Sequence, residues 1–266
     1  MQIFWHDLKS YRRSTVVWSV SLGLMAVLFL ALFPSFTQDV EASQALLKNL
    51  PAPVREALGI SLANFFTVLG FFSYLFTFVS VAGAVQAMNV GVGIIAKEST
   101  GKTADFLLSK PVSRNTVISQ KLFAATLVLV LTSIVFTLAA LTAAYLFSKD
   151  SFDAAALVMI ALSLLPLQLI FMALGMCVAV LLGRIKSVIA VTLPTVFAFF
   201  IVGSVGSVVD NEVSRYLTPF KYFDPQYIVQ HGFYEMKFMG LAMLIIAAAL
   251  TLTYLMFNKK DINSGV

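Results

Sequence analysis

The chain has 266 residues, of which 59% are hydrophobic and only 12% are charged, whereas an ordinary soluble domain is about 25% charged. This small number of charged residues cannot cover the surface of a water-soluble protein of this length. We therefore expect many of the hydrophobic residues to face lipid. One cysteine, Cys177, and two histidines exclude an internal disulfide and leave too few ligands for a multi-cysteine zinc or iron–sulfur site.

Six stretches of the sequence lack Asp, Glu, Lys and Arg and are long enough to cross a bilayer. About 20 helical residues span the ~30 Å hydrocarbon core, and a backbone inside lipid must satisfy its own hydrogen bonds, which favours helices. We therefore predict an all-α polytopic membrane protein with six transmembrane helices. They are expected at about residues 14–34, 62–89, 122–147, 155–182, 188–209 and 238–257.

The second stretch is too long for one crossing and barely long enough for two. The distribution of charges therefore has to decide how many times this stretch crosses the membrane. One crossing per stretch places 12 of the 18 basic residues on one side of the membrane, together with 4 of the 13 acidic ones. The positive-inside rule then makes that side cytoplasmic and places both termini there. Topology thus accounts for the net charge of +5, and we do not expect nucleic-acid binding.

Residues 1–13 precede the first predicted span and carry a helical pattern. Phe4, Leu8 and Tyr11 recur at helical spacing, with Asp7 and the basic residues elsewhere around the helix. This pattern predicts an amphipathic helix that lies in the inner interface of the membrane. A frayed basic tail is the alternative.

Residues 97–116 connect the second and third predicted spans on the inner side. Thr103 is suited to cap a helix and Pro111 to end it, so a helix of about two turns is expected between them. Leu107 and Leu108 lie on its apolar stripe. A short amphipathic helix between spans inserts that stripe either into lipid headgroups or into a groove on another protein.

The sequence Gly101-Lys102-Thr103 is similar to the end of a phosphate-binding loop, but the rest of that pattern is missing. Ala96 stands where the pattern requires glycine, and a membrane span replaces the required strand. We therefore expect no ATP site, and no cofactor, in this chain.

The layout and the loop together resemble the membrane subunits of type 2 ATP-binding cassette (ABC) transporters. That family has six spans with both ends inside and a characteristic loop after the second span. The loop positions that carry the resemblance are Glu98, Gly101 and Thr103 with Lys102 between them, the Leu107-Leu108 pair, and Pro111-Val112-Ser113-Arg114. The segment 217–225, within the predicted outer loop 210–237, also resembles the family.

The resemblance implies a permease that exports a peptide, drug or lipid-like molecule across the cell (inner, cytoplasmic) membrane of a prokaryote. It implies two partner ATPase subunits, which bind ATP and Mg²⁺, and a second permease, identical or homologous. The short loop helix would be a coupling helix that docks the ATPase. The docking residues that it implies are Glu98, Gly101, Thr103, Leu107, Leu108, Pro111 and Arg114.

The second span is rich in aromatic residues with polar residues between them. One interpretation of this pattern is a path for an amphipathic substrate. The candidate path residues are Asn64, Thr67, Phe71 and Tyr74. Phenylalanines that face lipid or pack helices together are the commoner alternative. Gln86 and Gln168 are either packing hydrogen bonds or substrate contacts.

Two other functions compete with an ABC permease. An ion-coupled secondary transporter usually keeps ionisable residues within its spans, and the six charge-free stretches contain none. A noncatalytic membrane scaffold is the second alternative. An intramembrane enzyme is disfavoured because the spans hold serines and threonines without a histidine or aspartate partner.

Overall fold

A computed structural model describes residues 2–57, 60, 64–100, 113–148, 151–182, 185–208 and 212–259. Within these residues every regular element is a helix, and six helices are long and apolar enough to cross a membrane. This confirms the predicted all-α polytopic fold. The six candidate spans are Ile3–Gln38, Val68–Lys97, Arg114–Phe147, Ala154–Leu182, Val188–Ser207 and Met236–Asn258.

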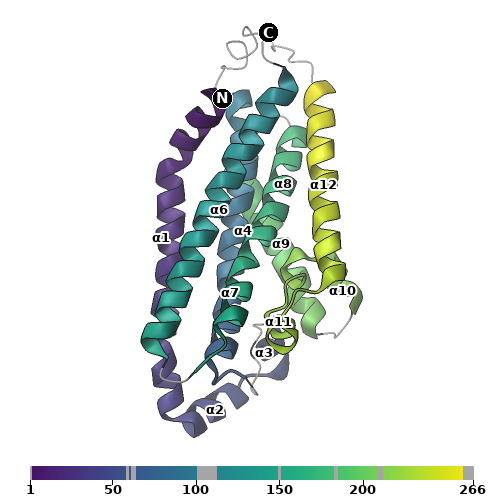
Figure 1. Cartoon of the computed structure of the whole chain (residues 1–266). Helices are drawn as coiled ribbons and strands as arrows, with labels where there is room; N and C mark the ends of the chain where they lie inside the picture. The colour runs from purple at the N-terminus through teal and green to yellow at the C-terminus, as the bar shows by residue number, and fades with distance from the viewer. Residues whose placement is uncertain are drawn as a thin grey trace.

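The long helices run alternately up and down in one bundle (Figure 1). They are α1 (Gln2–Gln38), α4 (Val68–Thr100), α6 (Arg114–Phe147), the consecutive pair α7 (Ala154–Leu162) and α8 (Leu164–Leu182), α9 (Val188–Val208) and α12 (Met236–Lys259). The start of α1 and the end of α12 lie at the same end of the bundle, which we call the terminal end. The opposite end is called the distal end.

The first helix differs from the expectation of an interfacial helix followed by a separate span. α1 is one continuous helix of 37 residues from Gln2 to Gln38, so residues 2–13 form its first turns. No proline or glycine stands before Gly23 to end the helix. Pro34 lies within its last turns.

The second span is a single helix, but it is shifted along the sequence relative to the predicted 62–89. α4 begins at Val68, where the Thr67 hydroxyl accepts a hydrogen bond from the Gly70 amide at 3.1 Å. It continues to Thr100 because the residues after Asn89 contain no helix breaker apart from two glycines. The helix therefore runs about 16 Å beyond the predicted end.

Short helices cover the distal end (Figure 1). They are α2 (Val40–Lys48), α3 (Ala52–Ala57), α10 (Glu212–Leu217), the 3₁₀ turn η1 (Pro219–Lys221) and α11 (Pro225–His231). Aspartates cap two of them, since Asp39 accepts the amide of Ala42 and Asp224 accepts that of Gln226. Gly232 ends α11 with a φ of 72°, a conformation that glycine adopts without strain.

The spans pack most extensively in two pairs, α1 with α6 and α4 with α8. Glycines allow the close approach of the second pair. A Cβ atom at Gly91 would collide with the carbonyl oxygen of Met172. A Cβ atom at Gly175 would lie 2.8 Å from the carbonyl oxygen of Met88. Small residues at such crossings are typical of membrane helices.

Buried polar side chains join the two pairs near the middle of the bundle. The Gln86 amide of α4 donates to the Thr132 hydroxyl of α6 at 2.9 Å and accepts from Gln168 of α8 at 3.1 Å. Ser19 of α1 donates to the same Thr132 hydroxyl at 3.3 Å. Gln86 and Gln168 therefore act as packing hydrogen bonds, one of the two roles that the sequence allows.

Candidate functional site

Most of the predicted docking residues fall outside the described part of the chain. The backbone of Glu98 belongs to the last turn of α4. The side chain of Glu98, and the residues Gly101, Thr103, Leu107, Leu108 and Pro111, lie outside the described residues. Their docking role stays a prediction. The flanks of this loop are described, and both lie at the terminal end (Figure 1).

Arg114, the first residue of α6, contacts the end of α12. Its guanidinium donates to the carbonyl oxygens of Phe257 at 3.4 Å and Asn258 at 3.1 Å. A cation at the carboxyl end of a helix is favourable because the carbonyls there carry partial negative charge. The Asn258 amide donates to Asn115 at 2.7 Å, so the start of α6 is held against the end of α12.

A buried ion pair between α6 and α1 also lies at the terminal end. Lys121 of α6 places its ammonium 3.6 Å from a carboxylate oxygen of Asp7 in α1, and both side chains are less than 10% exposed. The same ammonium donates to the carbonyl oxygen of Ile94 in α4 at 2.8 Å. One lysine therefore joins three helices.

Further contacts hold the first turns of α1 to α4. The Lys97 ammonium donates to the Ser10 hydroxyl at 2.6 Å and lies 4.1 Å from the centre of the Tyr11 ring, which is a cation–π geometry. The Tyr11 hydroxyl lies so close to Gly93 that a Cβ atom there would be 2.8 Å away. We call Asp7, Ser10, Tyr11, Ile94, Lys97 and Lys121 the terminal cluster.

Sequence reasoning missed this cluster and misplaced Asp7. Asp7 follows Phe4 by three residues and precedes Tyr11 by four, so it lies on their face of the helix. The structure buries Asp7 to 4% exposure and packs Phe4, Leu8 and Tyr11 against the core. The expectation that Asp7 lies elsewhere around the helix was therefore wrong, and the same spacing rule could have corrected it.

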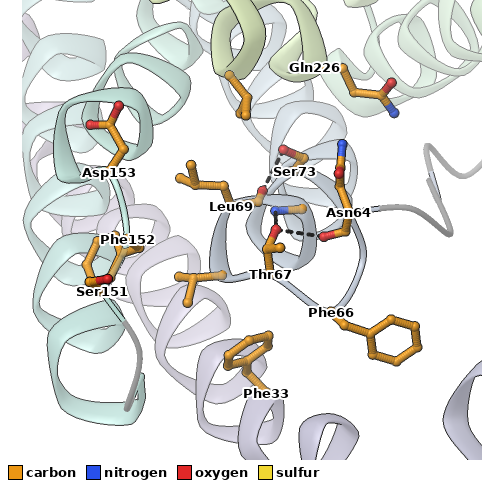
Figure 2. A pocket seen from close by; sticks show the side chains of 13 residues that line it. Phe33, Asn64, Phe66, Thr67, Leu69, Ser73, Ser151, Phe152, Asp153 and Gln226 are labelled. Atoms are coloured by element: carbon orange, nitrogen blue, oxygen red, sulfur yellow. Dashed lines mark hydrogen bonds between the residues drawn. The ribbon is translucent and has the colours of Figure 1, made fainter. Parts of the chain in front are cut away.

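A pocket of about 380 Å³ opens at the distal end, between α1, the start of α4, the start of α7 and α11 (Figure 2). Two of the four candidate path residues, Asn64 and Thr67, line it. The other lining residues are Phe33, Phe66, Val68, Leu69, Gly70, Ser73, Ser151, Phe152, Asp153, Gln226 and Val229. A volume of this order suits a small organic ligand.

Two of the hydroxyls of the pocket wall, those of Thr67 and Ser73, are already used by the backbone. Thr67 donates to the Asn64 carbonyl at 2.7 Å, and Ser73 donates to the Leu69 carbonyl at 2.7 Å, as Figure 2 shows. Among the described residues, no lysine or arginine lines the pocket, and its one carboxylate belongs to Asp153. The lining thus offers apolar surface, two amides, the Ser151 hydroxyl and one carboxylate, which suits an amphipathic ligand better than an anion.

The other two candidate path residues, Phe71 and Tyr74, are not among the residues that line the pocket; they belong to an aromatic cluster that includes Phe33 of the pocket wall. Phe71 is 2% exposed, and its ring centre lies 5.5 Å from that of Phe33 and 5.3 Å from that of Phe65. The Tyr74 ring lies 5.6 Å from Phe65 and 5.2 Å from Phe78. Such edge and tilted contacts favour packing, so Phe71 and Tyr74 support the wall that carries the pocket.

Ion pairs of a more exposed kind lie at the distal end, where α10 meets α12. Arg215 donates to Glu235 at 2.7 Å, and Lys237 lies 2.9 Å from the same carboxylate. Burial acts to raise the pKa of Glu235, but the hydrogen bonds and charges of Lys237 and Arg215 outweigh it and lower this pKa below its ordinary value.

No metal centre is found in the part of the chain that the structure describes, since no three His, Cys, Asp or Glu side chains there come close enough to hold an ion. Cys177 is buried in that part. The two candidate regions are thus the terminal end, with the flanks of the loop, and the distal pocket.

Comparison with known proteins identifies the family. Residues 1–262 match the family described as ABC-2 family transporter protein. No curated protein matches the chain. Six apolar helices accompany this match, as expected of a multi-pass membrane component of an ABC transporter. The chain therefore belongs to the ABC-2 family of transporter proteins.

Proposed function

We propose that the chain is the permease subunit of an ATP-driven exporter and that residues 97–116 dock a separate ATPase subunit. The observation that carries this proposal is the family match over residues 1–262. The lack of a complete phosphate-binding loop in the sequence agrees with ATP and Mg²⁺ being bound by the partner. Both flanks of the loop lie at one end of the bundle (Figure 1), so a partner there contacts α4 and α6 together.

The working unit contains two ATPases and two permeases, the second permease being identical or homologous. Both termini and the docking loop face the cytoplasm of a prokaryotic cell, in agreement with the positive-inside rule. ATP binding favours one of two permease conformations. It can do so only because the affinity for ATP differs between the two conformations of the transporter.

The distal pocket is part of the substrate path in this proposal. Its apolar walls, with the amides of Asn64 and Gln226, suit a peptide, drug or lipid-like molecule with one polar end. Phe33, on α1, forms one side of it, so a movement of α1 changes its shape.

Co-purification tests the docking. Leu107→Asp places a charge on the apolar stripe of the loop, and we expect it to abolish retention of the ATPase while membrane insertion continues. The matched control is Leu46→Asp in α2, since Leu46 is 70% exposed at the distal end and should retain the ATPase fully. Unchanged retention by Leu107→Asp would overturn the docking assignment.

Reconstitution separates this function from its two rivals. A permease moves substrate, or changes conformation, when its ATPase and ATP are present in the vesicle. A secondary transporter does so with an ion gradient and no nucleotide, and a scaffold does neither. If an ion gradient alone drives transport, Asp7 and Lys121 are the ionisable residues to replace next.

A further inference from the structure

We propose that Asp7 is a positioning residue that couples the flanks of the docking loop to α1 and, through α1, to the distal pocket. This inference rests on the proposed function. It starts from the terminal cluster, in which one end of α1 contacts the last turns of α4 and the first turns of α6. These are the two helices that residues 101–112 connect in the sequence.

The contacts of α1 involve both flanks of the loop. On the α4 side, Lys97 donates to Ser10 at 2.6 Å and covers the Tyr11 ring. On the α6 side, the Phe4 amide donates to the Gln120 side chain at 3.3 Å. A displacement of either flank must therefore move the start of α1 or break these contacts.

Asp7 is the point at which the two sides meet. Its carboxylate pairs with Lys121 of α6, and Lys121 also binds the Ile94 carbonyl of α4. Within the described residues, one carboxylate oxygen of Asp7 is buried and has no hydrogen bond. A buried carboxylate whose salt-bridge partner lies 3.6 Å away is sensitive to small movements of that cation, because little water is present to replace it.

α1 carries the effect to the other end of the molecule. It is one helix from Gln2 to Gln38, which at 1.5 Å per residue is about 55 Å long. Phe33, near its distal end, lines the pocket. A shift of α1 at Asp7 therefore reaches the pocket wall without passing through a loop.

The wider packing agrees with a relative movement of this kind. α1 packs mainly on α6, and α4 packs mainly on α8, so the loop joins one pair to the other. The distal pocket lies between the same two pairs, with Phe33 on one side and the start of α4 on the other. The terminal cluster and the pocket thus lie on one boundary, at opposite ends of it.

The test uses the complete transporter with its ATPase and follows the distal end of α1. Nitroxide labels at Leu32 of α1 and Leu244 of α12, both more than half exposed, are introduced after Cys177→Ala. The distance between them is measured without nucleotide and with ADP and vanadate, and ATP hydrolysis is measured in the same sample. In the otherwise unchanged chain we expect the distance to shift with nucleotide.

Asp7→Asn keeps the size of the side chain and removes its charge. We expect the ATPase to be retained and hydrolysis to continue, while the nucleotide-dependent shift is lost. Asp7→Glu should restore the shift, which a purely steric role would not predict. Asp39→Asn is the matched control, because asparagine caps a helix as well as aspartate does and Asp39 caps α2 at the distal end; it should leave the shift intact.

Ser10→Ala provides a second variant that disturbs no buried charge. It removes the hydrogen bond from Lys97 and should reduce the shift less than Asp7→Asn does. A full nucleotide-dependent distance shift in Asp7→Asn, or an equal loss of that shift in Asp39→Asn, would overturn this inference and leave the proposed function standing. A chain that retains no ATPase when unaltered contradicts the proposed function and the inference with it.

Discussion

The ion pairs at the two ends of the molecule differ in a way that distance alone does not reveal. At the distal end, Arg215 and Glu235 lie 2.7 Å apart with side chains 30% and 14% exposed. At the terminal end, Lys121 and Asp7 lie 3.6 Å apart with side chains 4% and 6% exposed. The shorter pair is partly in contact with solvent, and the longer pair is buried among three helices.

Burial decides what each pair does for the protein. A partly exposed pair contributes roughly 0.2–1 kcal/mol, because solvent weakens the attraction and salt screens it. A buried pair contributes little net stability relative to apolar residues of the same size, but removing one partner leaves an uncompensated charge. The distal pair is therefore replaceable, whereas the terminal pair binds α1, α4 and α6 into a fixed arrangement.

Removing the terminal lysine should have the largest effect on stability. Lys121→Met leaves the Asp7 carboxylate buried without its salt-bridge partner, and breaking such a pair costs about 3–5 kcal/mol. The free energy of unfolding, measured in mixed detergent micelles, should fall by that order.

The double variant Asp7→Leu with Lys121→Met removes both charges and provides the control. Its stability should recover most of the loss, since two apolar residues replace the pair. If the double variant is as unstable as the single one, the loss comes from packing and the comparison between the two ends fails.

The capping of α7 at the distal end should have an intermediate effect. The Asp153 carboxylate accepts the amides of Ala155 and Ala156 at 2.9 and 3.1 Å. Asp153→Ala removes this cap and should cost about 1 kcal/mol, whereas Asp153→Asn should cost little. Thermal unfolding of both variants checks this order, and an equal loss in both would assign the effect to charge rather than to capping.

The distal ion pair should have the smallest effect. Glu235→Gln should change the free energy of unfolding by less than about 1 kcal/mol, because Arg215 and Lys237 remain partly solvated. A loss as large as that of Lys121→Met would contradict the contrast between the two ends.

The dependence on pH sharpens this prediction. The pKa of Glu235 is lower in the folded chain than its ordinary value of 4.5. The pair therefore stabilises the fold above that value, and the stabilisation is lost as the pH falls through the lowered pKa. In unfolding measured from pH 7 down to about pH 4, the stabilisation from Glu235 should stay constant at first and should decrease only at the lower end of that range.

The spans were predictable from the sequence because a charge-free run is a sufficient signal for a helix in lipid. The prediction 155–182 agrees closely with Ala154–Leu182. Helix ends were less predictable, since apolar residues continue past the lipid. α4 begins where Thr67 caps it, six residues after the predicted start.

The candidate sites were predictable only in part, because they depend on contacts between segments far apart in the sequence. Asn64 and Thr67 were identified as polar residues among aromatic ones, but the pocket also needs Phe33, Phe152 and Gln226 from other elements. The charge-free runs excluded Asp7 and Lys121, which stand just outside the predicted spans. Only the packing of α1 against α4 and α6 buries them.

The central claim is that the loop after α4 faces the compartment that holds the ATPase, and labelling from outside intact cells tests it most directly. Single cysteines are placed at Ser109 in the loop and at Ala45 in α2, at the distal end, in a chain with Cys177→Ala. A membrane-impermeant maleimide should label Ala45→Cys in intact cells and Ser109→Cys only after the membrane is permeabilised. Labelling of Ser109→Cys in intact cells would contradict the account.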